Sequence, residues 1–114
     1  MSEYTTVTGN IQIANEVLAN IASTAALEAE GVAYMASHFT EDIASKLGRK
    51  RPFKGIGLQV DNEKVSISVE IVVRSGTKIQ DVAKDVQQKV KNAIETMTSF
   101  TANEIHVHIT GLVA

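Results

Sequence analysis

The chain has 114 residues, 44% of them hydrophobic and 21% charged, and its 11 Lys and Arg against 13 Asp and Glu give a formal net charge of −2. This length and polarity predict a single domain over residues 1–114 that folds without a disulfide or a structural metal. Cysteine is absent, which excludes a thiol nucleophile and cysteine-ligated zinc and favours a cytoplasmic location. The sequence also lacks an apolar run of about 18 residues, which predicts no membrane span.

The first half of the chain predicts two strands and two helices. Residues 7–13 alternate apolar and polar side chains in their second half, which suits a short strand. Residues 15–30 predict a helix that Gly31 ends, because glycine adopts the left-handed backbone that other residues resist. Residues 32–36 predict a second strand, and a short helix is expected from the N-cap Thr40 through Leu47. The apolar stripe of the longer helix is Val17, Leu18, Ile21, Ala22, Ala25 and Ala29.

The second half predicts a hairpin, a long helix and a last strand. A hairpin is predicted by the alternation of apolar and polar side chains over residues 56–60 and 65–71, on either side of a turn at 61–64. The two glycines of Gly55-x-Gly57 suggest a close-packed or bulged site before this hairpin. Thr77 and Gln80 have the spacing of a capping box that would begin the helix. Residues 104–109 alternate again and predict the closing strand. The expected core stripe of the long helix is Ile79, Val82, Ala83, Val86, Val90, Ala93, Ile94 and Met97.

The order of these elements predicts the fold class. Each long amphipathic helix has one apolar stripe, and each alternating strand has one apolar face. Both stripes are covered at once if the two long helices lie on the same face of one sheet. We therefore expect a two-layer α+β domain with a mostly antiparallel sheet, two long helices on one face and one short helix.

Positive charge is concentrated in one stretch of the chain. Residues 1–45 carry six acidic residues and no Lys or Arg, whereas residues 46–54 carry five basic residues and no acid. A solvated loop is the simplest interpretation, but cations beside an aromatic side chain also suit contact with a protein partner or an anion. The candidate contact residues are Lys46, Arg49, Lys50, Arg51, Phe53 and Lys54.

The sequence contains candidates for two other kinds of site. His106 and His108 would share one face of the last strand and could bind a metal, with a third ligand from His38 or a carboxylate. The simpler interpretation is that they are polar residues on the solvent-exposed face of the strand, which is the ordinary outcome of alternation. Phe53 within the basic stretch could stack a base of RNA or single-stranded DNA, but the chain has only five Tyr and Phe and no Trp. No nucleophile elbow, phosphate-binding loop or zinc-protease motif occurs, which predicts neither an enzyme nor a cofactor.

Several stretches, in their order and spacing over nearly the whole chain, resemble the alkaline shock protein family of Gram-positive bacteria. They include Gly9-Asn10-Ile11-Gln12-Ile13, Glu30-Gly31-Val32, Lys54-Gly55-Ile56-Gly57-Leu58, Val69-Glu70-Ile71-Val72-Val73, Ile94-Glu95-Thr96-Met97-Thr98 and Ile105-His106-Val107-His108-Ile109-Thr110-Gly111. One departure is Arg74-Ser75 before Gly76, where an aromatic or acidic residue is usual.

The resemblance implies a small non-enzymatic α+β protein of the stress response and the cell envelope. It implies action by self-association or by docking to a membrane-anchored partner, so that a cytoplasmic chain would be associated with the membrane through that partner. The alternative is an RNA-binding or single-strand-binding module that uses the basic stretch 46–54.

Overall fold

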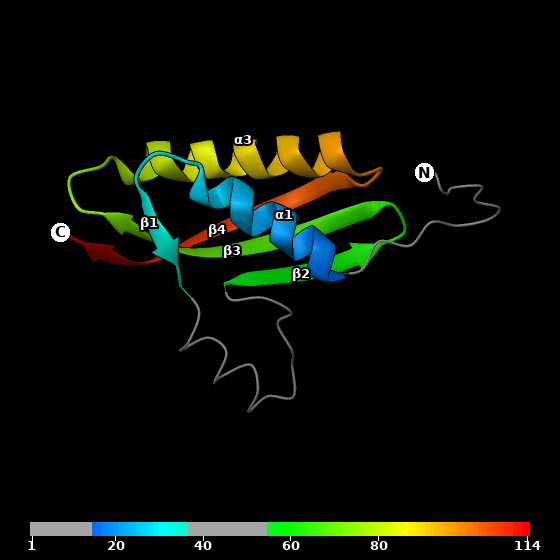
Figure 1. Ribbon diagram of the computed structural model, residues 1–114, viewed down its shortest axis with the longest axis horizontal. Coiled ribbons are helices and arrows are strands. Elements are labelled where there is room, and N and C mark those ends of the chain that lie inside the picture. The colour runs from blue at the N-terminus through cyan, green and yellow to red at the C-terminus, as the bar shows by residue number, and fades with distance from the viewer. Residues whose placement is uncertain (1–14, 37–54) are drawn as a thin grey trace, which may run out of the picture.

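The computed structural model describes residues 15–36 and 55–114. Within these ranges it contains two helices and one four-stranded sheet (Figure 1). The strand expected at 7–13 and the short helix expected at 40–47 lie outside the described residues. The elements are α1 (Asn15–Leu27), β1 (Val32–Met35), β2 (Ile56–Asp61), β3 (Lys64–Arg74), α3 (Ile79–Met97) and β4 (Thr101–Val113).

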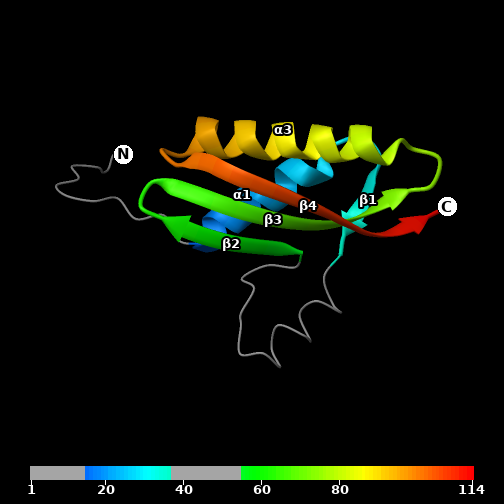
Figure 2. The same cartoon turned by 180° about the vertical axis from the view of Figure 1, so that it is seen from behind.

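The sheet is built around β3. Strands β2 and β1 follow one another along one edge of β3, both antiparallel to it, and β4 runs parallel along the other edge (Figure 2). The expectation of a mostly antiparallel sheet holds for two of the three pairings. The third is parallel because α3 carries the chain back along the sheet before β4 begins, as a crossover helix must.

The two short strands meet at the middle of β3. The backbone N–H of Ala36 donates to the carbonyl of Glu70 (2.9 Å), and the N–H of Glu70 donates to the carbonyl of Gly55 (2.8 Å). A Cβ atom on Gly55 would lie 2.6 Å from the Ala36 carbonyl oxygen and 2.9 Å from that of Glu70. The close-packed site expected before the hairpin is therefore confirmed at Gly55.

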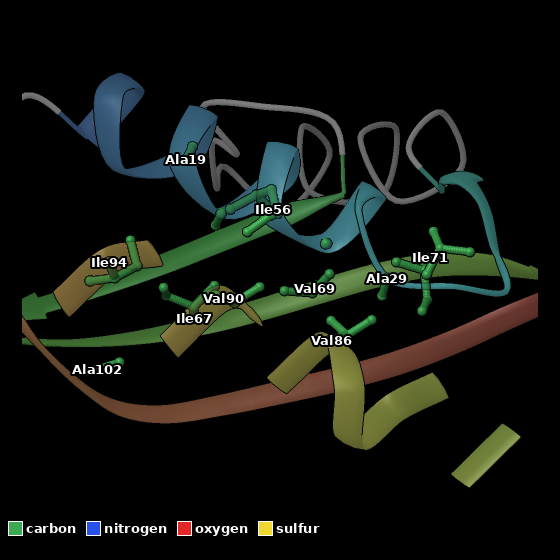
Figure 3. Close-up of a cluster of buried hydrophobic side chains, with 14 of the residues drawn as sticks. Ala19, Ala29, Ile56, Ile67, Val69, Ile71, Val86, Val90, Ile94 and Ala102 are labelled. Atoms are coloured by element: carbon green, nitrogen blue, oxygen red, sulfur yellow. The ribbon is translucent and has the colours of Figure 1, made fainter. Parts of the chain in front are cut away.

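The core lies between one face of the sheet and the two helices (Figure 3). Five alternating residues of β3 turn wholly buried side chains toward the helices, and the period-two pattern of residues 65–71 predicted the first four of them. Helix α1 contributes mainly alanines, which allow it to pack close to the sheet. The β3 residues are Val65, Ile67, Val69, Ile71 and Val73, and α3 adds Val82, Val86, Val90 and Ile94.

The helix ends differ from the sequence predictions. Helix α1 ends at Leu27, and its last carbonyls accept short-range bonds, such as Ala29 N–H to Ala26 O at 3.1 Å, before Gly31 turns the chain with φ of 98°. The N-cap of α3 is Lys78, which makes no side-chain capping bond. Thr77 instead donates its hydroxyl to the carbonyl of Arg74 at 2.7 Å. The predicted capping box is therefore wrong.

Three residues of the predicted core stripes are exposed. Ile79 and Met97, at the two ends of α3, are 44% and 67% exposed, and Val17 in the first turn of α1 is 47% exposed. With 19 residues α3 is about 28 Å long, whereas α1 with 13 is about 20 Å long. The shorter helix cannot cover both ends of the longer one, so Ile79 and Met97 at the ends of the α3 stripe remain at the surface.

Candidate functional site

Where residues 66–70 of β3 pair with residues 104–108 of β4, the face of the sheet that turns away from the helices is polar. Figure 2 shows that neither α1 nor α3 lies in front of it. The register places alternate residues of β4 beside alternate residues of β3 on this face, as the closing-strand pattern predicted. The three neighbouring pairs are Ser66 with Glu104, Ser68 with His106, and Glu70 with His108.

The two histidines on this face do not form a metal-ligand set within the part of the chain that the structure describes. His106 Nε2 lies 3.0 Å from Glu104 Oε1, and both side chains are more than half exposed, at 56% and 60%. Across residues 15–36 and 55–114, no group of three or more His, Asp or Glu side chains is arranged to hold a metal ion. His38, the third ligand considered, lies outside the described residues.

The basic stretch also falls outside the described residues. This applies to Lys46, Arg49, Lys50, Arg51, Phe53 and Lys54. The described chain stops at Ala36 and resumes at Gly55, and both residues pair with Glu70 on the central strand. Contact of the basic stretch with a protein partner, an anion or nucleic acid stays a prediction from the sequence.

The helix side carries a groove that sequence reasoning missed. It lies between α1 and α3, has a volume of about 630 Å³, and is open to solvent. In Figure 1 the two helices run in roughly opposite directions and diverge toward the first turn of α1. Its lining residues are Asn20, Ile21, Thr24 and Ala25 of α1, Glu28 directly after α1, and Lys89, Asn92, Ala93, Thr96 and Met97 of α3.

The groove has an apolar floor and polar walls. Ile21 and Ala93 pack against the core and are partly buried, while Met97 at one end is largely exposed. At the other end stand Glu28 and Lys89, one on each wall. No residue in the described ranges forms an ion pair with Glu28, and Lys89 has only a loose exposed contact, with its Nζ 3.8 Å from Asp85 Oδ1.

Two i,i+4 ion pairs lie along α3. Besides the contact of Lys89 with Asp85, the Nζ atom of Lys91 lies 3.6 Å from Glu95 Oε2. Glu95 also accepts a hydrogen bond from the backbone N–H of Ala102 at 3.0 Å, which ties the end of α3 to the start of β4.

None of the helices in residues 15–36 and 55–114 combines the length and the apolarity that crossing a membrane requires.

Comparison with known proteins identifies relatives in two genera. The chain is 35% identical over 112 residues to the uncharacterized protein YqhY of Bacillus subtilis (strain 168), covering 98% of this chain and 83% of that protein. It is 33% identical over 112 residues to the uncharacterized protein YloU of the same strain, covering 96% and 93%. The uncharacterized protein Spy1614 of Streptococcus pyogenes serotype M6 is 29% identical over 103 residues, covering 89% and 85%.

Two solved variants of the MamM CTD share the fold. Their TM-scores are 0.60 and 0.59 at 15% identity, and each alignment covers 85% of this chain and 94% of the other. Likeness at this level of identity concerns the fold alone. The sequence profile of the alkaline shock protein 23 family, which is described by a cell envelope-related function, matches residues 3–114. The resemblance seen in the sequence is thus confirmed, and the chain belongs to the alkaline shock protein 23 family of Gram-positive bacteria.

Proposed function

We propose that this chain is a non-enzymatic interaction protein of the cell envelope, which acts by binding other protein molecules. The observation that carries the proposal is the groove between α1 and α3. Its apolar floor faces outward although the domain already has a complete core between the helices and the sheet. An apolar groove with a polar rim on the outside of a folded domain is typical of a protein contact site.

The family description supports the setting of this function. A cell envelope-related role suits a cytoplasmic domain that reaches the membrane through a partner. In this proposal the partner supplies the membrane segment and the present chain supplies a rigid docking surface. A part in the stress response follows from the same resemblance and is proposed with it.

The basic stretch is proposed as a second contact region. Its cations and its aromatic side chain would meet an acidic surface of the partner. Replacing Arg49, Lys50 and Arg51 together by Ala should reduce recovery of the partner from native cells. Unchanged recovery would remove this region from the proposal and leave the groove as the contact site.

Photo-crosslinking in intact cells tests the proposal. A photoreactive amino acid at Thr96 would lie in the groove, and one at the exposed Gln59 of β2 would serve as the matched control away from it. We expect protein adducts from position 96 well above those from position 59. Adducts no more frequent than the control would contradict the proposal, and adducts to RNA would favour the nucleic-acid alternative.

A further inference from the structure

We infer that the groove between α1 and α3 is one half of an interface between two copies of this chain, related by a twofold axis that runs along the groove. The inference rests on the proposed function, because it identifies which protein molecule occupies the contact site. It is carried by the charges and the apolar side chains of the two groove walls.

The charged end of the groove supplies the first argument. Glu28 on the α1 wall and Lys89 on the α3 wall line the same end. Rotation about an axis along the groove exchanges the walls but keeps each residue at its level, so α1 of the second copy lies over α3 of the first. Glu28 of each copy then faces Lys89 of the other. Two symmetric contacts of opposite charge result from one pair of residues.

The charge of α1 argues against the other face-to-face arrangement. An axis across the groove would place α1 over α1 of the second copy. Residues 15–36 carry Glu16, Glu28 and Glu30 and no Lys or Arg. Such stacking would bring two copies of this acidic segment together, which like-charge repulsion disfavours. The axis along the groove avoids this repulsion.

The apolar end fits the same rotation. Met97 lies eight residues after Lys89, and Asn20 lies eight residues before Glu28, so on these antiparallel helices both are about 12 Å from the charged end. Met97 of one copy therefore meets the Asn20–Ile21 level of the other, next to exposed Val17. Methionine is suited to this position because its unbranched side chain adapts to the surface that it covers. The most exposed large apolar side chain in the described chain, at 67%, would become covered.

Charge exchange provides the decisive test. The mass of the wild type should rise from 12.3 kDa toward twice that value with concentration at low salt, as measured by sedimentation velocity. Glu28→Lys alone and Lys89→Glu alone each create two like-charge contacts, and each should raise the dimer dissociation constant on the order of tenfold or more. The double variant should recover the wild-type constant. An equimolar mixture of the two single variants should also recover it, because every contact in the mixed dimer again joins opposite charges.

An apolar pair of variants tests the other end of the groove. Met97→Gln should weaken the dimer several-fold, whereas Leu112→Gln, at a side chain 58% exposed on β4 and outside the groove, should not. Both residues are surface residues, so melting temperatures close to that of the wild type would show that each variant folds.

Three results would overturn the inference: a wild type that stays monomeric at all concentrations, single variants that dimerise as well as the wild type, or a mixture that remains monomeric. A monomeric wild type that still gave adducts from position 96 to a different protein would refute the second copy and leave the proposed function standing.

Discussion

Replacing Gly31 by Ala should destabilise the domain severely for two separable reasons. Gly31 has φ of 98°, a left-handed conformation that costs a residue with a Cβ atom about 1–2 kcal/mol. The added Cβ would also lie 2.7 Å from Val82 Cγ2 and 3.2 Å from Thr77 Cγ2. Relieving such overpacking costs about 1–3 kcal/mol. The two terms together predict a loss of about 2–5 kcal/mol in the free energy of unfolding.

Gly76 offers a matched control for the backbone term. Its φ is 93°, but a Cβ on Gly76 would meet nothing within 4 Å. Gly76→Ala should therefore cost only the conformational term, about 1–2 kcal/mol. The difference between the two variants measures the contact with the side chains of α3 and of the turn before it.

Urea unfolding followed by circular dichroism gives both free energies, and thermal melts give a second measure. For a domain of this size about 1 kcal/mol corresponds to a shift of about 4–8 °C in Tm. A further variant, Val82→Ala, removes the methyl group that Gly31→Ala would strike. The double variant should thus lose less than the sum of the single losses. Equal losses for Gly31→Ala and Gly76→Ala, together with simple additivity, would refute the reasoning.

Three further predictions concern α3. Ile94→Ala should cost about 2–5 kcal/mol because Ile94 is wholly buried, whereas Ile79→Ala, at 44% exposure, should cost clearly less; similar losses in urea unfolding would contradict the burial pattern. Glu95→Ala should cost about 1–3 kcal/mol because it leaves the part-buried backbone N–H of Ala102 without its acceptor, while Lys91→Ala should cost about 0.5 kcal/mol or less; the reverse order would mean that the ion pair dominates. Lys78→Ser should raise the free energy of unfolding by about 1 kcal/mol over Lys78→Ala, because the N-cap of α3 now lacks a side-chain acceptor; no gain in Tm would show that the hydroxyl cannot reach the helix.

The accuracy of the sequence predictions varied along α3 for a physical reason. The central stripe was predicted correctly because a period of 3.6 residues depends on the helix alone. The start was wrong because the Thr77 hydroxyl donates to Arg74, a partner that the capping pattern does not contain. The ends of the stripe were wrong because burial of Ile79 and Met97 depends on the length of α1.

The candidate sites divide in the same manner. Alternation predicted correctly that His106 and His108 share the outer face, but the contact of His106 with Glu104 depends on rotamers that the pattern does not specify. The groove could not be predicted, since its lining residues come from two helices and their spacing depends on the angle between them. Ile21, Ala93 and Met97 at the margins of the stripes were the available signal.

The amino-acid order by itself determined which segments form helices and strands in the described chain, which face of each is apolar, and that the layers make an α+β domain. These properties are local, because side-chain periodicity and glycine's backbone freedom act within a few residues. Only the tertiary structure decided that β4 lies parallel to β3, that β1 and β2 share one edge, and that α1 diverges from α3 to open a groove. Those outcomes depend on how residues far apart in the chain fill a common core, where packing density rather than local pattern selects the arrangement.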